Sequence, residues 1–460
     1  QIYHKMMEGY PQTELDIIDM TVRMFVEPKL ILDEEMLIAH KEKIKQETAQ
    51  AIEDSGTTRE IMASQQKFAH YLEELGITVP TKKSPTTGQQ IPAFSKTDSA
   101  YIQMQNMYPQ YKHLWDGREA VKSRIEETRA QRFLESTNHD GTFSVPLRYY
   151  AAHTGRFGGT ESINLQNLPR GSALRTAVMA PEGQQLYVVD LSNIEARMLA
   201  WLAKEADLLD AFAAGRDVYS EFASEVYGTK VTKDDKIQRF VGKTCILGLG
   251  YGMGHVKFRA TLALGQGGIA VDIDENEAIR IVNLYRQKNH NIVSLWNKCG
   301  HALTGMVSGA SGSICNLLPY DKDGITLPNG LKIKYHALRN TSDGFEYISD
   351  ARTFRKLTQQ RLLTGEQSKI DWTRIYGGKV TENVVQALAR IVVAEQMASI
   401  GQSYHVVFQV HDEVIITTRE HDTAYAQQLV ERKMSTPPRW AKDLPVACES
   451  GVGYNYGEAK

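Results

Sequence analysis

The sequence predicts a mixed fold of the α/β (α+β) class, in which a few short strands stand among long helices. A β-branched run at 187–189 precedes an apolar helical pattern that continues to residue 203, so a buried strand leads into a helix. Residues 405–418 form two Val/Ile-rich half-strands, the pattern of a hairpin. Residues 13–77 and 205–310 are mostly helical in pattern.

The N-terminal part is expected to be helical with one polar interruption. Helices are predicted from Thr13 to about Glu27, over residues 34–53, and over residues 58–75 with Gly76 as the C-cap. Residues 79–97 are rich in Pro, Gly and Lys and predict a loop. The helical pattern returns over residues 101–135.

The remaining elements are shorter, apart from one long helix. Short strands are predicted over residues 143–190, and a hairpin over 324–337 with Asn329-Gly330 at its turn. Residues 345–375 are charged, contain no recognisable motif and indicate an insertion. Residues 379–400 predict a long helix.

Composition limits the class of protein. A chain of 460 residues with 42% hydrophobic content can build a large core and two to four substructures. The absence of an apolar run of 18 residues and of a signal-peptide pattern indicates a cytoplasmic protein without a membrane span. The four cysteines have no zinc-ligand spacing and are expected to be reduced. The first residue is glutamine, so we expect a fragment or a processed chain.

The net charge of -2 argues against a dedicated nucleic-acid-binding module, which is usually basic. The local distribution of charge weakens that argument. Residues 153–175 contain three arginines and a histidine against the single acid Glu161. A nearly neutral enzyme with basic stripes of this kind still fits a phosphate backbone.

The strand-to-helix segment carries the first candidate site. Asp190 stands where the strand ends, and Ser192 with Glu195 forms a capping-box pattern at the start of the helix. Either acid alone is explained by the preference of turns and caps for such residues. An acid at a strand end beside a helix start can also project into a cleft and hold a cation.

The predicted hairpin at 405–418 carries the second candidate site. His411, Asp412 and Glu413 lie between its apolar strands. A solvated tip explains the acids most simply. Because the flanking strands are apolar, the hairpin is expected to be packed, and burying unpaired carboxylates is costly unless they meet a metal or a cation.

A helical segment at 239–252 carries the third candidate site. Its side chains recur every four residues and share one helix face: Arg239, Lys243, Leu247 and Tyr251. Two cations one turn apart repel each other unless they share a polyanion such as a triphosphate. Gly242, Gly248 and Gly250 predict close approach by a ligand or by another backbone.

Together these segments resemble motifs A, B and C of family A DNA polymerases, the DNA polymerase I type, and several segments look closest to bacteriophage members. Residues 190–197 resemble motif A, 239–252 motif B and 409–413 motif C. Residues 153–156 with 164–170 resemble the lead-in to motif A. Residues 382–390 resemble the helix before motif C, and 451–456 the family's ending. The resemblance covers most of residues 145–460 and more weakly the N-terminal third.

The resemblance implies a right-hand polymerase with an antiparallel-sheet palm, helical fingers and a helical thumb. The thumb would comprise residues 1–144, the palm 145–204 and 325–460, and the fingers 205–324. Asp190 and Asp412 would meet on the palm surface. The loop at 79–97 is equally compatible with a solvated connector and with a thumb tip that touches DNA.

The implied activity is template-directed DNA synthesis, in which dNTPs are added to a primer 3′ end by two-metal nucleotidyl transfer. Two Mg²⁺ ions, with Mn²⁺ as a substitute, would be held by Asp190, Asp412 and the Leu191 carbonyl, with Glu413 as a secondary acid. Catalytic and dNTP-binding roles are expected for Lys243, Arg239, Leu247, Tyr251, Glu195 and Asn193. Contacts with the primer-template are expected for Arg156, Gln166, Asn167, Arg170, Gln386 and His411.

Three residues depart from the family pattern. Leu247 replaces the usual Phe or Tyr, Tyr219 replaces a His, and Glu382 replaces an Asn. Leu247 puts sugar selectivity in doubt, since that position touches the nucleotide sugar. At Tyr219 the contact with the triphosphate would differ.

Two other functions stay open. A single-subunit RNA polymerase shares the hand, but Glu195 and Glu413 argue against it. A catalytically inactive DNA-binding subunit is disfavoured because Asp190, Asp412 and Lys243 are all present. No 3′–5′ exonuclease is expected in this chain, although an upstream exonuclease domain or other replication proteins are expected partners of the parent protein. The location would be the host cytoplasm if a phage encodes it.

Overall fold

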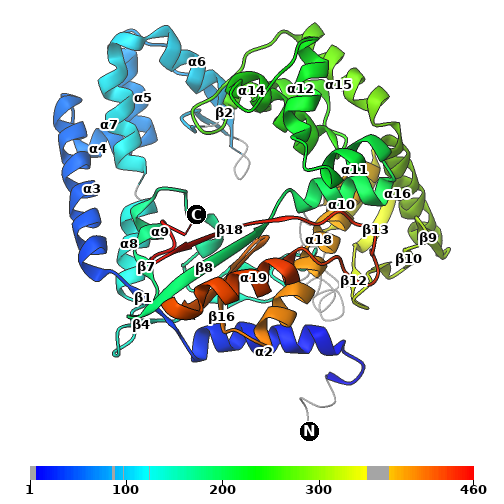
Figure 1. Cartoon of the computed structure of the whole chain (residues 1–460). Helices are drawn as coiled ribbons and strands as arrows, with labels where there is room; N and C mark the ends of the chain where they lie inside the picture. The colour runs from blue at the N-terminus through cyan, green and yellow to red at the C-terminus, as the bar shows by residue number, and fades with distance from the viewer. Residues whose placement is uncertain (1–6, 85–88, 97, 124, 350–371, 460) are drawn as a thin grey trace, which may run out of the picture.

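The computed structural model describes residues 7–84, 89–96, 98–123, 125–349 and 372–459. Two helical lobes stand on either side of a central sheet (Figure 1). One lobe comes from the N-terminal part of the chain and the other from residues 194–308. Helices mix with antiparallel sheets throughout, so the predicted fold class is confirmed.

The central sheet has the strand order β16-β17-β8-β18, and each neighbouring pair is antiparallel. Its strands are β8 (Gln184–Leu191), β16 (Val406–Val410), β17 (Glu413–Arg419) and β18 (Cys448–Gly453). The hairpin predicted from the apolar half-strands is β16-β17. Both faces of these two strands are buried, so they appear in the sequence as continuous apolar runs.

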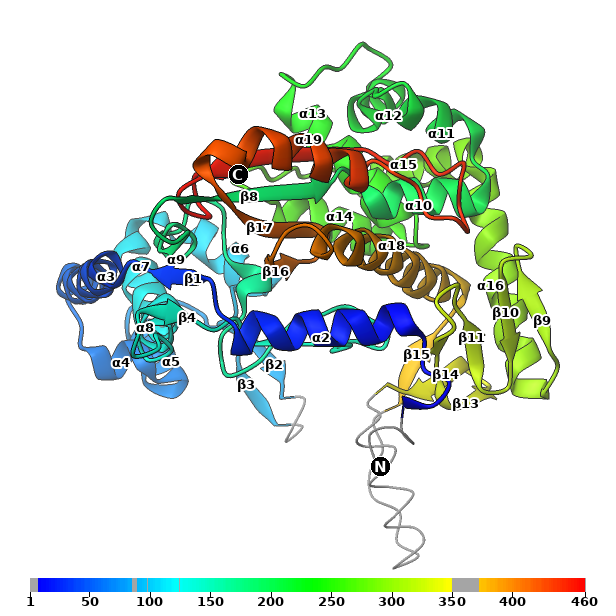
Figure 2. The ribbon, with the colours of Figure 1, turned by 60° about the horizontal axis from the view of Figure 1, so that its bottom comes forward.

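Three helices support this sheet. α18 (Gly377–Gly401) contacts α19 (Thr423–Met434), and α2 (Gln12–Val26) runs alongside α18, as Figure 2 shows. Among the described residues, α18 alone is long and apolar enough to cross a membrane, but 72% of its apolar stretch is buried inside the protein. It is therefore explained as the core helix of the fold, and the long helix predicted at 379–400 is confirmed.

A buried ion pair ties α2 to α18. Glu14 on α2 is 1% exposed and pairs with Arg390 on α18. Its carboxylate also accepts hydrogen bonds from Tyr149 at 2.5 Å and Asn329 at 2.7 Å. Burial opposes ionisation of Glu14, but these donors outweigh it and lower its pKa.

The N-terminal lobe has its own core around Phe68, Leu72 and Trp115. Its elements are α3 (Glu34–Asp54), α4 (Arg59–Ala63), α5 (Gln65–Glu74), β2 (Thr81–Lys83), β3 (Gln90–Pro92), α6 (Ser99–Met107), η1 (Pro109–Tyr111), α7 (Lys112–Lys122) and α8 (Ile125–Leu134). The single helix predicted at 58–75 is wrong. The chain breaks at Ser64, whose hydroxyl caps a new helix by accepting from the Lys67 N–H at 3.2 Å. The segment predicted as a loop at 79–97 contains the β2-β3 hairpin.

The second lobe contains α10 and the predicted helices of the 205–310 region. They are α10 (Ile194–Ala203), α11 (Ala206–Ala213), α12 (Val218–Tyr227), α13 (Lys236–Thr244), η3 (Cys245–Leu249), α14 (His255–Leu264), α15 (Glu275–Lys288) and α16 (His290–Ser308). At Gly242 an added Cβ would lie 2.0 Å from the Tyr219 carbonyl oxygen. The close approach predicted there is therefore to another backbone, that of α12.

Short strands complete the fold. They are β1 (Leu30–Leu32), β4 (Thr142–Phe143), β5 (Leu147–Arg148), β6 (Gly158–Gly159), β7 (Val178–Met179), β9 (Gly312–Ile314), β10 (Leu318–Asp321), β11 (Gly324–Thr326), β12 (Lys332–Ile333), β13 (His336–Thr341), β14 (Gly344–Ile348) and β15 (Thr373–Ile375), with the short helices η2 (Leu165–Asn167), α9 (Ala173–Thr176) and η4 (Glu420–Asp422). The predicted Asn329-Gly330 hairpin is β11-β12, with Gly330 at φ +83°. Most of the segment predicted as an insertion, 350–371, lies outside the described residues.

Candidate active site

A cavity of about 450 Å³ lies where the end of β8 and the β16-β17 turn face α10, α12, α13 and α18. The predicted site residues that line it are Arg156, Arg170, Asp190, Leu191, Asn193, Glu195, Lys243, Leu247, Gln386, His411 and Asp412. Gln166, Asn167, Arg239, Tyr251 and Glu413 are not among its lining residues. A larger hollow of about 700 Å³ lies between α6 and α14 but contains none of the predicted residues, so chemistry rather than size identifies the site.

Two carboxylates reach the cavity, one from the end of β8 and one from the β16-β17 turn. The Leu191 N–H donates to the Asp412 carbonyl oxygen at 3.1 Å, which holds the end of β8 against the hairpin turn. Asp190 and Asp412 both line the cavity, although they are far apart in the sequence. The two acids that the sequence predicts to meet thus line the same cavity.

Glu413 has a different environment from its neighbour Asp412. It opens β17 directly opposite Asp190, and its side chain is buried. Its Oε2 accepts a hydrogen bond from the Tyr456 hydroxyl at 2.7 Å and lies 3.9 Å from Arg175 Nη2. Because residues directly opposite each other in an antiparallel pair share one face, Glu413 lies on the same face of the sheet as Asp190, although Glu413 does not line the cavity.

The hairpin turn is held in an uncommon backbone conformation. His411 has φ +50°, in the left-handed region that few non-glycine residues adopt. Its N–H donates to Gln166 Oε1 at 2.9 Å, and Gln166 Nε2 donates to the Gln409 carbonyl at 2.6 Å. Gln166 is thus buried beneath the turn, whereas Asn167 is exposed. Burial, assisted by the charge of Arg156, lowers the pKa of His411 and favours its neutral form.

The capping box predicted at Ser192 and Glu195 is wrong. Helix α10 begins one residue later, at Ile194, and its N-cap residue Asn193 has a left-handed backbone with φ 55° and no side-chain cap. The Glu195 carboxylate instead forms an ion pair with Arg156 Nη2. Burial of that guanidinium lowers the pKa of Arg156.

The predicted four-residue stripe does not lie on one continuous α-helix. α13 ends at Thr244, and Cys245–Leu249 forms a π-helical turn. Lys243 and Leu247 line the cavity, and Leu247 is 39% exposed. Arg239 pairs with Asp217 through two hydrogen bonds, at 2.7 and 3.2 Å, and Tyr251 lies beyond the turn, where burial raises its pKa.

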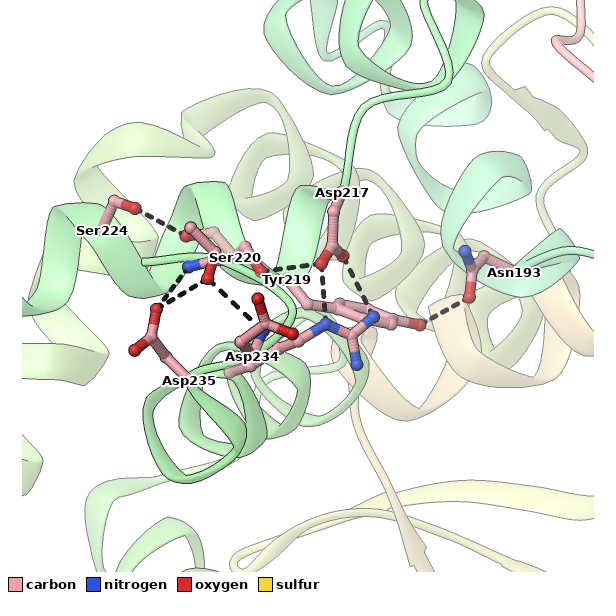
Figure 3. A network of polar contacts seen from close by, with 9 residues as sticks. Asn193, Asp217, Tyr219, Ser220, Ser224, Asp234 and Asp235 are labelled. Carbon is pink, nitrogen blue, oxygen red and sulfur yellow. Dashed lines mark hydrogen bonds and ion pairs between the residues drawn. The ribbon is translucent and has the colours of Figure 1, made fainter. Parts of the chain in front are cut away.

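A hydrogen bond links the turn between β8 and α10 to helix α12 of the second lobe. The Tyr219 hydroxyl donates to Asn193 Oδ1 at 2.6 Å, and Figure 3 shows Tyr219 between Asn193 and Asp217. Asp217 in turn accepts from Arg239. Burial opposes ionisation of Asp217, but hydrogen bonds from Arg239 and Ser220 outweigh it and lower the pKa of that carboxyl. Arg239 is therefore anchored beside the cavity.

Sequence reasoning missed two charged residues of the cavity wall, Glu449 and Arg390. Glu449 lies on β18 directly opposite Asp190. Its place follows only from the pairing of β18 with β8, and nothing in the local sequence around Glu449 indicates it. Arg390 lies one turn beyond Gln386 on α18, a spacing that could have indicated a shared helix face.

Comparison with known proteins identifies the family. The sequence profile described as DNA polymerase family A matches residues 33–305, which is more than half of the 460 residues. The chain belongs to DNA polymerase family A. Family membership confirms the resemblance inferred from motifs A, B and C.

Individual family A relatives are distant. A DNA polymerase of Bacillus phage SP02 is 27% identical over 359 residues, which cover 66% of this chain and 51% of the phage protein. DNA polymerase I of Pseudomonas aeruginosa is 24% identical over 418 residues, or 89% of this chain and 39% of that protein. The chain thus spans about half the length, or less, of these family A relatives.

A solved polymerase structure supports the fold. The POL domain of Pol1 from M. smegmatis, in complex with a DNA primer-template and dNTP, has a TM-score of 0.68 and 21% identity. The match covers 97% of this chain and 70% of the other. It shows that nearly the whole chain follows the polymerase-domain fold.

Family A polymerases generally depend on divalent metal ions. In the described part of the chain, no three His, Cys, Asp or Glu side chains are arranged as a complete metal site. Asp190 and Asp412 nevertheless line one cavity with the backbone of Leu191. Mg²⁺ commonly takes one or two carboxylates and completes its shell with phosphate oxygens and water, so this donor set fits an ion shared with a phosphate substrate.

Proposed function

We propose that this chain carries out template-directed DNA synthesis, adding dNTPs to a primer 3′ end with release of pyrophosphate. The observation that carries the proposal is the convergence of Asp190 and Asp412 on one cavity that Lys243 also lines. Nucleotidyl transfer requires carboxylates near the reacting phosphate and cations along the triphosphate. This arrangement supplies both.

Asp190, Asp412 and the Leu191 carbonyl would hold two Mg²⁺ ions, for which Mn²⁺ could substitute. When bound, such ions supply Lewis-acid chemistry at both ends of an in-line displacement. Glu413 lies opposite Asp190 but does not line the cavity, and it accepts a hydrogen bond from Tyr456, so we assign it as a secondary acid that supports the strand pair without binding an ion directly.

The dNTP would lie between the turn at residues 190–195 and α13. The Lys243 ammonium would bind the triphosphate, and Arg239 would add a second positive charge while Asp217 fixes its direction. Glu195 would occupy the space of a ribose 2′ hydroxyl, and Leu247 would face the sugar. Tyr251 would lie near the templating base, and Asn193 would take part in the nucleotide site.

The primer-template would contact the basic side of the cavity. We assign direct contacts to Arg156, Arg170, Gln386 and His411, which line it, and to the exposed Asn167. Gln166 would act indirectly, because its two hydrogen bonds hold the turn that presents His411. Minor-groove acceptors are alike for all base pairs, so such contacts suit sequence-independent recognition.

We assign the lobes accordingly: residues 1–144 as thumb, 145–204 and 325–460 as palm, and 205–324 as fingers. The two helical lobes on either side of the central sheet support this division, except that α2 packs against α18 and the sheet and not within the N-terminal lobe. The enzyme would act in the cytoplasm, which is the host cytoplasm if a phage encodes it. The absence of 3′–5′ exonuclease activity from this chain stays a prediction.

Primer extension on a defined template tests the proposal. The purified chain should extend the primer with dNTPs and Mg²⁺, should extend poorly with NTPs, and should stop when EDTA is added. Extension with NTPs as efficient as with dNTPs would instead indicate an RNA polymerase. Binding of primer-template without any extension would indicate an inactive subunit.

A further inference from the structure

Tyr219 touches both sides of the candidate nucleotide site. Its hydroxyl donates to Asn193 Oδ1 at 2.6 Å, on the turn between β8 and α10. Its ring faces the Arg239 guanidinium, with Cζ 5.3 Å from the ring centroid. Both Tyr219 and Asn193 line the cavity, and Figure 3 shows the hydrogen bond that joins them. Arg239 is bonded in turn to Asp217.

The backbone of Tyr219 also lies against α13. Its carbonyl oxygen would be 2.0 Å from a Cβ at Gly242, the residue immediately before Lys243. One residue therefore contacts the cation-bearing helix through its ring and its backbone, and contacts the turn at residues 190–195 through its hydroxyl.

On the other side of the bond, the side chain of Asn193 does not cap the helix that it precedes. Asparagine is a favoured N-cap residue because its side chain accepts a hydrogen bond from the first helical N–H groups. At the start of α10 no such cap forms. The side-chain oxygen accepts from Tyr219 instead, which ties a left-handed residue between Asp190 and Glu195 to the second lobe.

We propose that Tyr219 is a positioning residue of the nucleotide site, whose hydroxyl bond to Asn193 sets the placement of the acidic turn at 190–195 against α13. The inference rests on the proposed function. A triphosphate substrate would be held by α13 while its sugar meets Glu195. The relative placement of these two elements therefore controls both dNTP affinity and the exclusion of ribonucleotides. Burial raises the pKa of Tyr219 to about 12, so the hydroxyl stays a donor at working pH.

A double-mutant cycle tests the bond. Tyr219→Phe removes the hydroxyl and keeps the ring, and Asn193→Gly removes the acceptor while still allowing the left-handed backbone. Each variant should raise KM for dNTP about fivefold, the equivalent of one hydrogen bond of about 1 kcal/mol, with little change in kcat. The double variant should be no worse than the poorer single variant.

The same variants should incorporate ribonucleotides more readily, a change that a loss of general stability would not produce. Tyr227→Phe removes a hydroxyl from the far end of α12, where the side chain is exposed, and should match the parent. Additive effects in the cycle, or an unchanged KM and unchanged sugar selectivity in Tyr219→Phe, would overturn the inference.

A readout without catalysis separates this inference from the proposed function. Amide hydrogen exchange should become faster at residues 191–196 in Tyr219→Phe and stay unchanged in Tyr227→Phe. If the parent fails to extend primers, the proposed function fails whatever the exchange result. If the parent extends primers and exchange at 191–196 is unaffected by Tyr219→Phe, the positioning role of Tyr219 fails alone.

Discussion

Arg156 and Glu195 form an ion pair across the wall of the candidate active site. Arg156 comes from the irregular segment before η2, and Glu195 from the first turn of α10. About a third of the arginine side chain and a quarter of the glutamate side chain remain exposed. The pair therefore brings together the residue proposed to contact the primer and the residue proposed to exclude ribonucleotides.

Replacing Glu195 with alanine should increase ribonucleotide incorporation strongly. The loss of thermal stability should be small, on the order of 1 kcal/mol, because the ion pair is partly exposed to solvent and no helix cap is lost. Competing rNTP and dNTP incorporation, together with melting temperatures, measures both effects. Glu182→Ala, at an exposed acid, is the control. Unchanged selectivity with a marked loss of stability would show that Glu195 is only structural.

Asp190→Asn and Asp412→Asn should each reduce extension by more than about a hundredfold, since even outer-shell metal partners account for losses of that size. Primer-template binding should persist. Glu413→Gln should mainly lower the melting temperature, because that side chain is buried against Tyr456. Single-turnover extension and a binding titration distinguish these outcomes. If either aspartate variant extends primers nearly as fast as the parent, that aspartate is not a metal ligand.

Leu247 should make the enzyme discriminate strongly against dideoxynucleotides. Its side chain lines the cavity but cannot hydrogen-bond near the sugar 3′ position. Leu247→Tyr should relax this discrimination, and Leu247→Met should retain it because methionine adds no hydroxyl. The ratio of ddNTP to dNTP incorporation is the measurement. If the tyrosine variant discriminates as the parent does, Leu247 does not face the nucleotide.

Gly242→Ala should destabilise the fold by about 1–3 kcal/mol, the usual cost of overpacking, because the new Cβ would meet the Tyr219 carbonyl. Gly300→Ala is the matched control. It lies within α16, where a Cβ has no neighbour within 4 Å, and should stabilise by about 0.5–1 kcal/mol. Urea unfolding of both variants provides the comparison, and equal effects would contradict the close packing of α12 and α13.

Stability should fall between pH 7.5 and 5.5, partly through His405. Burial first, and then the charges of Lys29 and Arg23, lower its pKa in the folded protein, while Glu27 opposes them. As the pH falls below about 6.5, the unfolded chain takes up the proton first, so the stability present at higher pH is lost. His405→Gln should show a smaller drop in melting temperature over this range. An equal drop would show that His405 does not contribute.

The local patterns of this sequence were sufficient for much of the fold. The apolar run before Asp190, the Asn329-Gly330 turn and the long helix at 379–400 all appear where they were predicted. Each of these elements is specified by interactions between residues only a few positions apart, so a short stretch of sequence is enough to predict it. The grouping of Asp190, Asp412 and Lys243 was accessible only through the motif resemblance to a known family.

Tertiary contacts decided which of those residues face the cavity and what holds them there. The left-handed turn at Asn193 moved the start of α10, so Glu195 pairs with Arg156 instead of capping the helix. Strand pairing buried Glu413 against Tyr456 and brought Glu449 opposite Asp190. The sequence by itself determined which segments form strands and helices, because propensity and periodicity act between near neighbours. The direction of each acidic side chain depends on backbone handedness and on partners that are distant in the sequence, which only the folded chain brings together.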